Sequence, residues 1–298
     1  MSIVYLTYQE IDKLKWDTCI HNSFNGLLYG YSWYLDVVTE QWDALVEGDY
    51  ERVMPLPYRR TMGFEQIYMP ALTPLLGVFS RTKISEDIVT KFINAIPRRF
   101  KTAHIAMNKY NNFNTKYTER RLLCMDLISV YDRLSAKYSA KTSERIAAAH
   151  NRGLYSKTGM NIGEFADFHR ANGGTIGTFD SIRLASLAHT LISLKVAEII
   201  AIHGPDGELL CAGLFVAHNN NATVHACSIS AKGQELHAPY MMLDTFIRTN
   251  SNKNITLDFT PFNHRIAQSF YTGFGCTAFT VKQYRHTSFV WPLNYIFR

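Results

Sequence analysis

The stretch Glu198-Ile199-Ile200-Ala201-Ile202-His203 is the first of three consecutive segments that decide how this chain folds. Its β-branched residues predict a strand. The following Gly204-Pro205-Asp206-Gly207 predicts a turn, because proline fixes φ and glycine accepts positive φ. Two more strands are expected, from Glu208 to Ala217 and from Thr223 to Ile229. The region therefore begins with three strands in succession.

A glycine-bearing loop and a helix follow the third strand. The loop runs from Ser230 to Ala238, and the helix is expected to begin near Pro239, because proline suits the first helical turn. The helix carries an apolar stripe and an opposite polar side, formed respectively by Met242, Leu243, Phe246 and Ile247 and by Asp244, Thr245 and Arg248. A strand (Ile255 to Phe259), a short helix (Ile266 to Phe274) and a closing strand (Phe279 to Tyr284) complete the expected order.

The second helix ends in the segment Phe270-Tyr271-Thr272-Gly273-Phe274-Gly275. This ending, together with the order of elements, resembles the GNAT (Gcn5-related N-acyltransferase) family. With the strand Leu257-Asp258-Phe259, the chain more narrowly resembles the tandem-GNAT proteins related to the FemABX peptidyltransferases. The resemblance implies an α/β fold with mixed sheets, in which two GNAT-like (acyl-CoA N-acyltransferase) domains lie in tandem with a helical connector.

The first half repeats this order of elements without repeating the sequence. It is expected to contain a hairpin, another strand, an amphipathic helix, a strand and a closing strand, at Trp42–Tyr58, Phe64–Met69, Ile84–Ile96, Ala103–Met107 and Leu122–Leu127. It lacks a glycine-bearing loop before its helix. We therefore expect residues 1–135 to form a structural or substrate-binding domain. Residues 136–298 are expected to form the helical connector and a second domain with the donor site.

Composition limits the classes of protein to consider. The chain has 298 residues, 47% hydrophobic and 19% charged, as in a globular protein of two domains. No apolar run is long enough to span a bilayer, and the N-terminus lacks the pattern of a secretory signal. The five cysteines are scattered and odd in number, which favours reduced thiols and a cytoplasmic location.

The charge balance points to anionic partners. A net charge of +6 favours phosphate-bearing cofactors, tRNA or anionic lipid precursors, although a generic basic surface explains it equally well. The basic residues form no continuous stripe, so DNA is not expected as a partner. The eleven histidines and five cysteines show no metal-ligand spacing, so no metal is expected.

Acyl transfer from a thioester requires a cradle for the donor's phosphates and groups that handle protons. A helix N-terminus preceded by a glycine loop can bind phosphate through its free N–H groups and its dipole. Lys232, Gly233, Gln234 and Ala238 occupy that place, and the resemblance assigns them to acyl-CoA. An ordinary strand-to-helix connection is the alternative interpretation.

Four further residues are candidates for catalysis. Tyr271 aligns with the tyrosine that some GNAT enzymes use as a general acid, and the alternative is a packed aromatic ring. Asp258 ends a strand in an apolar context, where a carboxylate with a raised pKa could accept a proton or cap the following loop. His225 and His264 are alternative bases, although a single histidine is more often structural.

Three functions remain open at this stage. The first is an N-acyltransferase that moves an acyl group from acyl-CoA to a small-molecule or peptide amine. The second is an aminoacyl-tRNA-dependent, FemABX-like peptidyltransferase acting on a cell-wall precursor. The third is a catalytically silent GNAT-like protein that binds a ligand or a partner. Close relatives tend to continue the Leu-Asp-Phe strand with Glu-Gly-Ser, where this chain has Thr260-Pro261-Phe262, which favours the third function.

Overall fold

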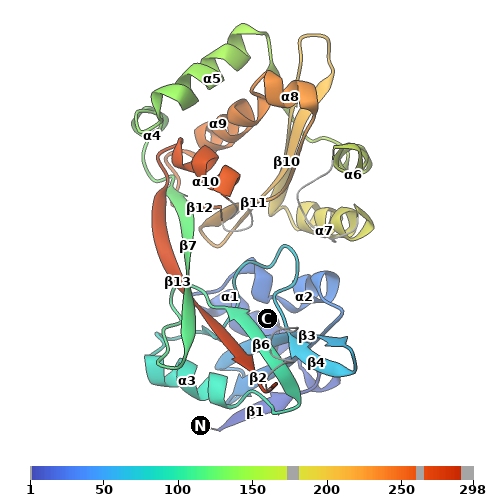
Figure 1. Ribbon diagram of the computed structural model, residues 1–298, viewed down its shortest axis with the longest axis vertical. Helices are drawn as coiled ribbons and strands as arrows, with labels where there is room; N and C mark the ends of the chain where they lie inside the picture. Colours follow the sequence, from blue (N-terminus) through green and yellow to red (C-terminus); the bar gives the residue numbers. More distant parts are fainter. Residues whose placement is uncertain (1, 173–180, 260–264, 290–298) are drawn as a thin grey trace. The chain divides into compact units, whose positions relative to one another are not determined.

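The computed structural model describes residues 2–172, 181–259 and 265–289 of the chain (Figure 1). The chain divides into two compact units. Unit 1 comprises Met1–Arg121 and Thr280–Arg298, and unit 2 comprises Leu122–Phe279. No helix among the described residues is long and apolar enough to cross a membrane.

Unit 1 is built on a mixed sheet. Its strands pair in the order β1 (Ile3–Leu6), β2 (Gln41–Glu47), β3 (Arg52–Thr61), β4 (Phe64–Ile67), β6 (Phe100–Ala106) and the end of β13 (Thr277–Thr287), and β5 (Phe79–Ser80) pairs with β3. Its helices are α1 (Lys13–Asn22), α2 (Ser32–Val38) and α3 (Glu86–Asn94). Helix α3 begins where the Ser85 side chain accepts a hydrogen bond from the N–H of Ile88, and it buries one apolar face.

Unit 2 has a second mixed sheet with helices on both faces. Its strands pair in the order β7 (Tyr117–Asp126), β12 (Thr256–Asp258), β11 (Asn221–Ile229), β10 (Leu209–His218), β9 (Ala197–His203) and β8 (Tyr155–Thr158). Its helices are α4 (Tyr131–Ser135), α5 (Ala140–Asn151), α6 (Ile162–Ala171), α7 (Ser181–Ser193), α8 (Ala231–Glu235), α9 (Ala238–Asn250) and α10 (Arg265–Thr272).

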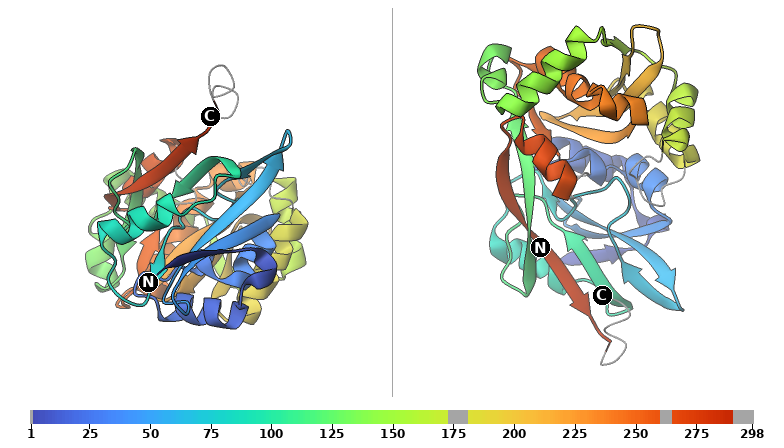
Figure 2. Two further views of the ribbon diagram at one scale, coloured as in Figure 1. Left: turned by 90° about the horizontal axis from the view of Figure 1, so that it is seen from below. Right: turned by 45° about the horizontal axis from the view of Figure 1, so that its top comes forward.

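Helices α9 and α6 cover opposite faces of the sheet in unit 2 (Figures 1 and 2). On one face, Phe215 of β10 stacks on Phe246 of α9 with ring centroids 4.4 Å apart. On the other face, the Ser228 hydroxyl of β11 lies 2.6 Å from Nδ1 of His169 on α6. Helix α5 packs on α9.

The expected repeat of elements is present, and two strands are exchanged between the repeats. Strand β4 is joined through α3 to its parallel partner β6, as β11 is joined through α9 to β12. Residues 124–126 of β7 pair with β12 in unit 2, whereas residues 283–287 of β13 pair with β6 in unit 1. Each closing strand therefore pairs with a strand of the other repeat, and the division of roles expected at 135/136 stays a prediction.

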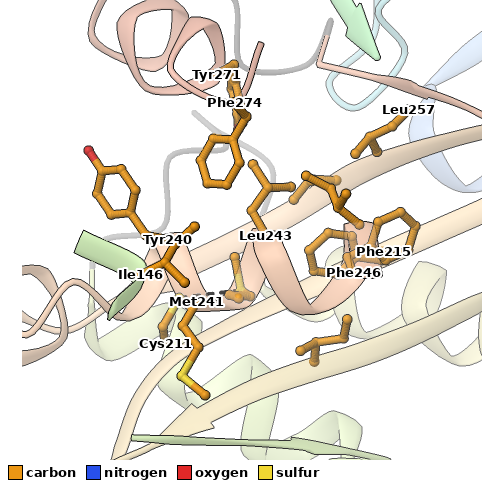
Figure 3. Close-up of a cluster of buried hydrophobic side chains, with 14 of the residues drawn as sticks. Ile146, Cys211, Phe215, Tyr240, Met241, Leu243, Phe246, Leu257, Tyr271 and Phe274 are labelled. Atoms are coloured by element: carbon orange, nitrogen blue, oxygen red, sulfur yellow. Dashed lines mark hydrogen bonds between the residues drawn. The ribbon is translucent and has the colours of Figure 1, made fainter. Parts of the chain in front are cut away.

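The apolar core of unit 2 lies between the sheet and α9 (Figure 3). Figure 3 shows Leu243 and Phe246 of α9 among side chains from β10, β12 and the segment after α10. Leu257 of β12 and Phe274 are fully buried in the same cluster. The apolar stripe expected on this helix is therefore the side that packs on the sheet.

The connector is helical as expected, with α4, α5 and α6, and it also contributes the edge strand β8. Two local expectations were wrong. The loop before Pro239 contains a short helix, α8, which begins at the Ser230 cap. Asp244, expected on a polar side, is only 2% exposed, because α5 and the segment before it cover that side of α9. The glycine-rich run at 173–177 lies outside the described residues.

Candidate functional site

Strands β11 and β12 part after three residue pairs. The parallel register runs from Asn221 opposite Thr256 to Thr223 opposite Asp258. Strand β12 then ends, and the N–H of Phe259 donates to the carbonyl of Leu123 at 3.0 Å. Strand β11 continues to Ile229 with β10 as its only strand partner among the described residues. This parting leaves room beside the second half of β11.

A β-bulge lies at the same place. Phe215 of β10 pairs with Val224, but the preceding Leu214 pairs with Ala226, so His225 is one residue more than the ladder requires. The extra residue shifts the alternation of side chains along β11 by one position. Val224 and Cys227 therefore face the same side of the sheet, toward α9, although they are three residues apart.

A pocket of about 500 Å³ opens on this side, within unit 2. Its volume is within the range of small-molecule sites. Strand β11, the start of α5, the start of α9, Gln234 of α8 and the end of α10 line it with Ser139, Lys141, Thr142, Arg145, Val224, Cys227, Ile229, Gln234, Pro239, Tyr240, Met242, Leu243, Ser269, Phe270, Tyr271 and Gly273.

The depth of the pocket is apolar and its mouth is polar and basic. Val224, Leu243 and Met242 are buried, whereas Ser139, Lys141, Gln234 and Ser269 are exposed. The only charged side chains in its described lining are Lys141 and Arg145, which stand four residues apart on one side of α5. A ligand with an anionic end and an apolar end fits this polarity.

The N-terminus of α9 adds to the positive potential at the mouth. His237 precedes the helix with φ of 63°, and no side chain caps the first turn. The Arg145 guanidinium donates to the hydroxyl of Tyr240 in that turn and lies over its ring at 4.9 Å. Burial lowers the pKa of His237, and the charges of Arg145 and Arg152 lower it further. Helix dipole and guanidinium groups both favour an anion here.

The segment Phe270–Gly275 attaches α10 to the start of α5. The carbonyl of Gly273 accepts a hydrogen bond from the N–H of Ser139 at 2.8 Å. A Cβ atom on Gly273 would overlap the Thr142 hydroxyl, and one on Gly275 would lie 2.8 Å from the carbonyl oxygen of Lys137. The two glycines thus let residues 137–142, which we call the strap, pass close to the end of α10. This close contact holds Lys141 and Arg145 over the pocket.

Tyr271 lies in the pocket wall. It is 6% exposed and stacks on Phe259 with centroids 4.1 Å apart. Burial, followed by the nearby thiols of Cys227, Cys276 and Cys211, raises the pKa of Tyr271 well above its usual value. Its hydroxyl therefore stays protonated at neutral pH and is a weaker acid than an exposed tyrosine. Tyr271 is therefore a packed ring that also borders the pocket, and its role as a general acid stays a prediction.

Of the four residues expected to hold donor phosphates, only Gln234 belongs to the pocket lining. Gln234 lines the pocket, and Ala238 is buried as the first residue of α9. Gly233 is buried, its N–H donates to Ser230 Oγ at 3.0 Å, and a Cβ on it would overlap the carbonyl oxygen of Leu210. Lys232 forms ion pairs with Glu208 and Asp206 of the β9–β10 hairpin.

The candidate bases lie away from the pocket lining. Asp258 pairs in register with Thr223, whereas its neighbour Leu257 belongs to the core beside α9, so the carboxylate is directed to the α6 face. His225 at the bulge is 1% exposed, and burial lowers its pKa to about 3, which leaves it neutral. His264 lies outside the described residues.

Sequence reasoning missed Lys141 and Arg145. Both belong to a connector that was interpreted only as covering and linking the repeats. The available signal was their i, i+4 spacing, which places them on one side of a helix. The described residues contain no group of three His, Cys, Asp or Glu side chains that could hold a metal ion.

Comparisons with known proteins identify the fold. FemX superposes with a TM-score of 0.65 at 11% identity, over 95% of this chain and 97% of that chain. The chain has the fold of FemX. A conserved protein of unknown function from Bacteroides thetaiotaomicron gives 0.59 at 12% identity (92% and 97% covered), and L-PGS from Bacillus licheniformis gives 0.57 at 9% identity (96% and 95% covered). The expected tandem GNAT-like, FemABX-related fold is confirmed. No family model and no curated protein matches the sequence.

Proposed function

We propose that this protein is an N-acyltransferase that moves an acyl group from acyl-CoA to an amine, with the pocket of unit 2 as the donor site. The observation that carries the proposal is the position of the pocket. It lies where β11 and β12 part, beside the N-terminus of α9, with an apolar depth and a mouth lined by Lys141 and Arg145. The FemX-like fold is consistent with a transferase.

The polarity of the pocket supports one orientation of the donor. Its phosphates would lie at the mouth, near Lys141, Arg145 and Gln234, where the first turn of α9 adds its dipole. The acyl end would lie in the depth, between β11 and α10. In this arrangement the cations of α5 take the role that the sequence had assigned to Lys232.

The proton transfers follow from the positions of two side chains. The amine attacks the thioester carbonyl carbon, the C–S bond breaks, and the Tyr271 hydroxyl donates a hydrogen bond to the departing thiolate, which then takes a proton from water. The amine's proton must leave on the acceptor's side. We assign that role to Asp258, which stands where β11 and β12 part and is directed to the α6 face, and this assignment requires the acceptor to enter from that face.

The proposal is tested by titrating acetyl-CoA into the protein in a calorimeter. The variant with Lys141→Ala and Arg145→Ala together is expected to bind at least about tenfold more weakly, because it loses two charge-assisted contacts. The control is Lys232→Ala, which removes a cation outside the pocket and is expected to bind within about twofold of the parent. Circular dichroism checks that each variant is folded.

Two results would reject this assignment. Absence of acetyl-CoA binding to the parent protein would remove acyl-CoA as the donor. If a charged tRNA then bound in a steeply salt-dependent manner, the peptidyltransferase alternative would replace the proposal. Loss of binding in Lys232→Ala, with full binding in the α5 double variant, would place the phosphates at α8 instead.

A further inference from the structure

We infer that the pocket of unit 2 selects an uncharged acyl group and discriminates against an acyl group that bears an ammonium, as an aminoacyl group does. This inference rests on the proposed function, because it concerns the acyl end of the same donor. It follows from the charges that surround the depth of the pocket.

No carboxylate belongs to the described lining of the pocket. Its charged members are Lys141 and Arg145, both cationic. An ammonium at the acyl end would therefore exchange water for an apolar depth with no counter-ion in the described lining.

The acidic groups of the lining that could become anions stay neutral. Burial raises the pKa of the Cys227 thiol to about 11. Burial also raises the pKa of Tyr271 well above its usual value. Neither side chain supplies a negative charge near pH 7. The acyl group would therefore contact Val224, Met242 and Leu243 and these two neutral side chains.

The carboxylates of α9 and β12, Asp244 and Asp258, are engaged or directed elsewhere. Asp244 on α9 accepts hydrogen bonds from Tyr131 at 2.8 Å and from Tyr138 at 3.1 Å, and it lies 3.5 Å from the Arg248 guanidinium. Asp258 is directed to the α6 face. The pocket thus remains cationic at its mouth and uncharged in its depth.

The test compares two isosteric donors on the unmodified protein. Butyryl-CoA ends in a methyl group where β-alanyl-CoA ends in an ammonium group of similar size. The ratio of their dissociation constants, measured by calorimetry, therefore reports the effect of the charge. We expect butyryl-CoA to bind at least about tenfold more tightly than β-alanyl-CoA, because burying an unpaired ammonium in a desolvated site is costly. The variant Cys227→Asp places a carboxylate beside the acyl group and is expected to reduce this ratio, while Cys227→Ser keeps it.

The outcomes separate the two proposals. Equal binding of both donors would overturn the inference and leave the acyltransferase proposal intact. Tighter binding of β-alanyl-CoA would do the same and would favour an aminoacyl donor. If neither donor bound, both proposals would fall. If Cys227→Asp does not fold, the ratio measured on the parent protein still decides the inference.

Discussion

The contact between Gly275 and Lys137 gives a sharp test of how the strap 137–142 is held. Gly275 has φ of 78°, and a Cβ atom there would lie 2.7 Å from the Lys137 Cβ and 2.8 Å from its carbonyl oxygen. The substitution Gly275→Ala therefore introduces a strained backbone conformation and a steric overlap with main-chain atoms. Main-chain atoms yield less readily than the end of a flexible side chain.

The two costs are estimated separately. An alanine in the left-handed region costs about 1–2 kcal/mol. Overpacking against a fixed neighbour costs about 1–3 kcal/mol more. We expect Gly275→Ala to lower the free energy of unfolding of unit 2 by about 2–5 kcal/mol.

Gly159 is the matched control. Its φ is 76°, and a Cβ atom there would meet nothing within 4 Å. Gly159→Ala therefore carries the conformational cost alone, offset by about 0.4–1 kcal/mol from the reduced entropy of the unfolded chain. The difference between the two variants isolates the contact with Lys137.

Urea unfolding followed by circular dichroism measures the loss of stability, and hydrogen exchange localises it. The Ser139 amide donates to the carbonyl of Gly273, so its exchange is expected to accelerate in Gly275→Ala and to stay unchanged in Gly159→Ala. Equal destabilisation by the two substitutions, or unchanged exchange at Ser139, would refute the reasoning.

Two further expectations concern the buried carboxylate of α9. Asp244→Ala leaves the Tyr131 and Tyr138 hydroxyls without their acceptor and is expected to cost about 3–5 kcal/mol in urea unfolding. Asp244→Asn should cost less, since its carbonyl still accepts, and an equal loss would contradict this role. Burial, followed by the hydrogen bond to Asp244, raises the pKa of Tyr131 to about 12 from 10.0. Its contribution to stability is complete below pH 10 and disappears as the pH rises through 12, so Tyr131→Phe should lose less stability than the parent over that interval. Parallel losses in both proteins would show that this group is not responsible.

The order of strands and helices could be predicted because each signal is local. Alternating and β-branched residues, Pro239 at a helix start and the turn after His203 act over a few neighbouring positions. The glycine-bearing ending of α10 was also visible in the sequence. The residues that these glycines contact could not be predicted, because Lys137 and Thr142 lie in a different part of the chain.

Within the site, single residues could be predicted better than their grouping. Tyr271 and Gln234 were named from the sequence, and both line the pocket. Lys232 was grouped with Gln234 by proximity in the sequence, but its ammonium pairs with carboxylates of the preceding hairpin. Arg145 was overlooked because nothing near it in the sequence marks a binding site.

The sequence by itself determined the tandem order of elements, the apolar side of α9 and the position of Tyr271 at the end of α10. Tertiary structure decided the exchange of β7 and β13, the bulge at His225 and the cations over the pocket. The reason is that an open strand edge pairs with whichever strand reaches it, and a bulge exists only relative to a partner. Such features depend on residues distant in sequence, whereas periodicity and turns depend on neighbours.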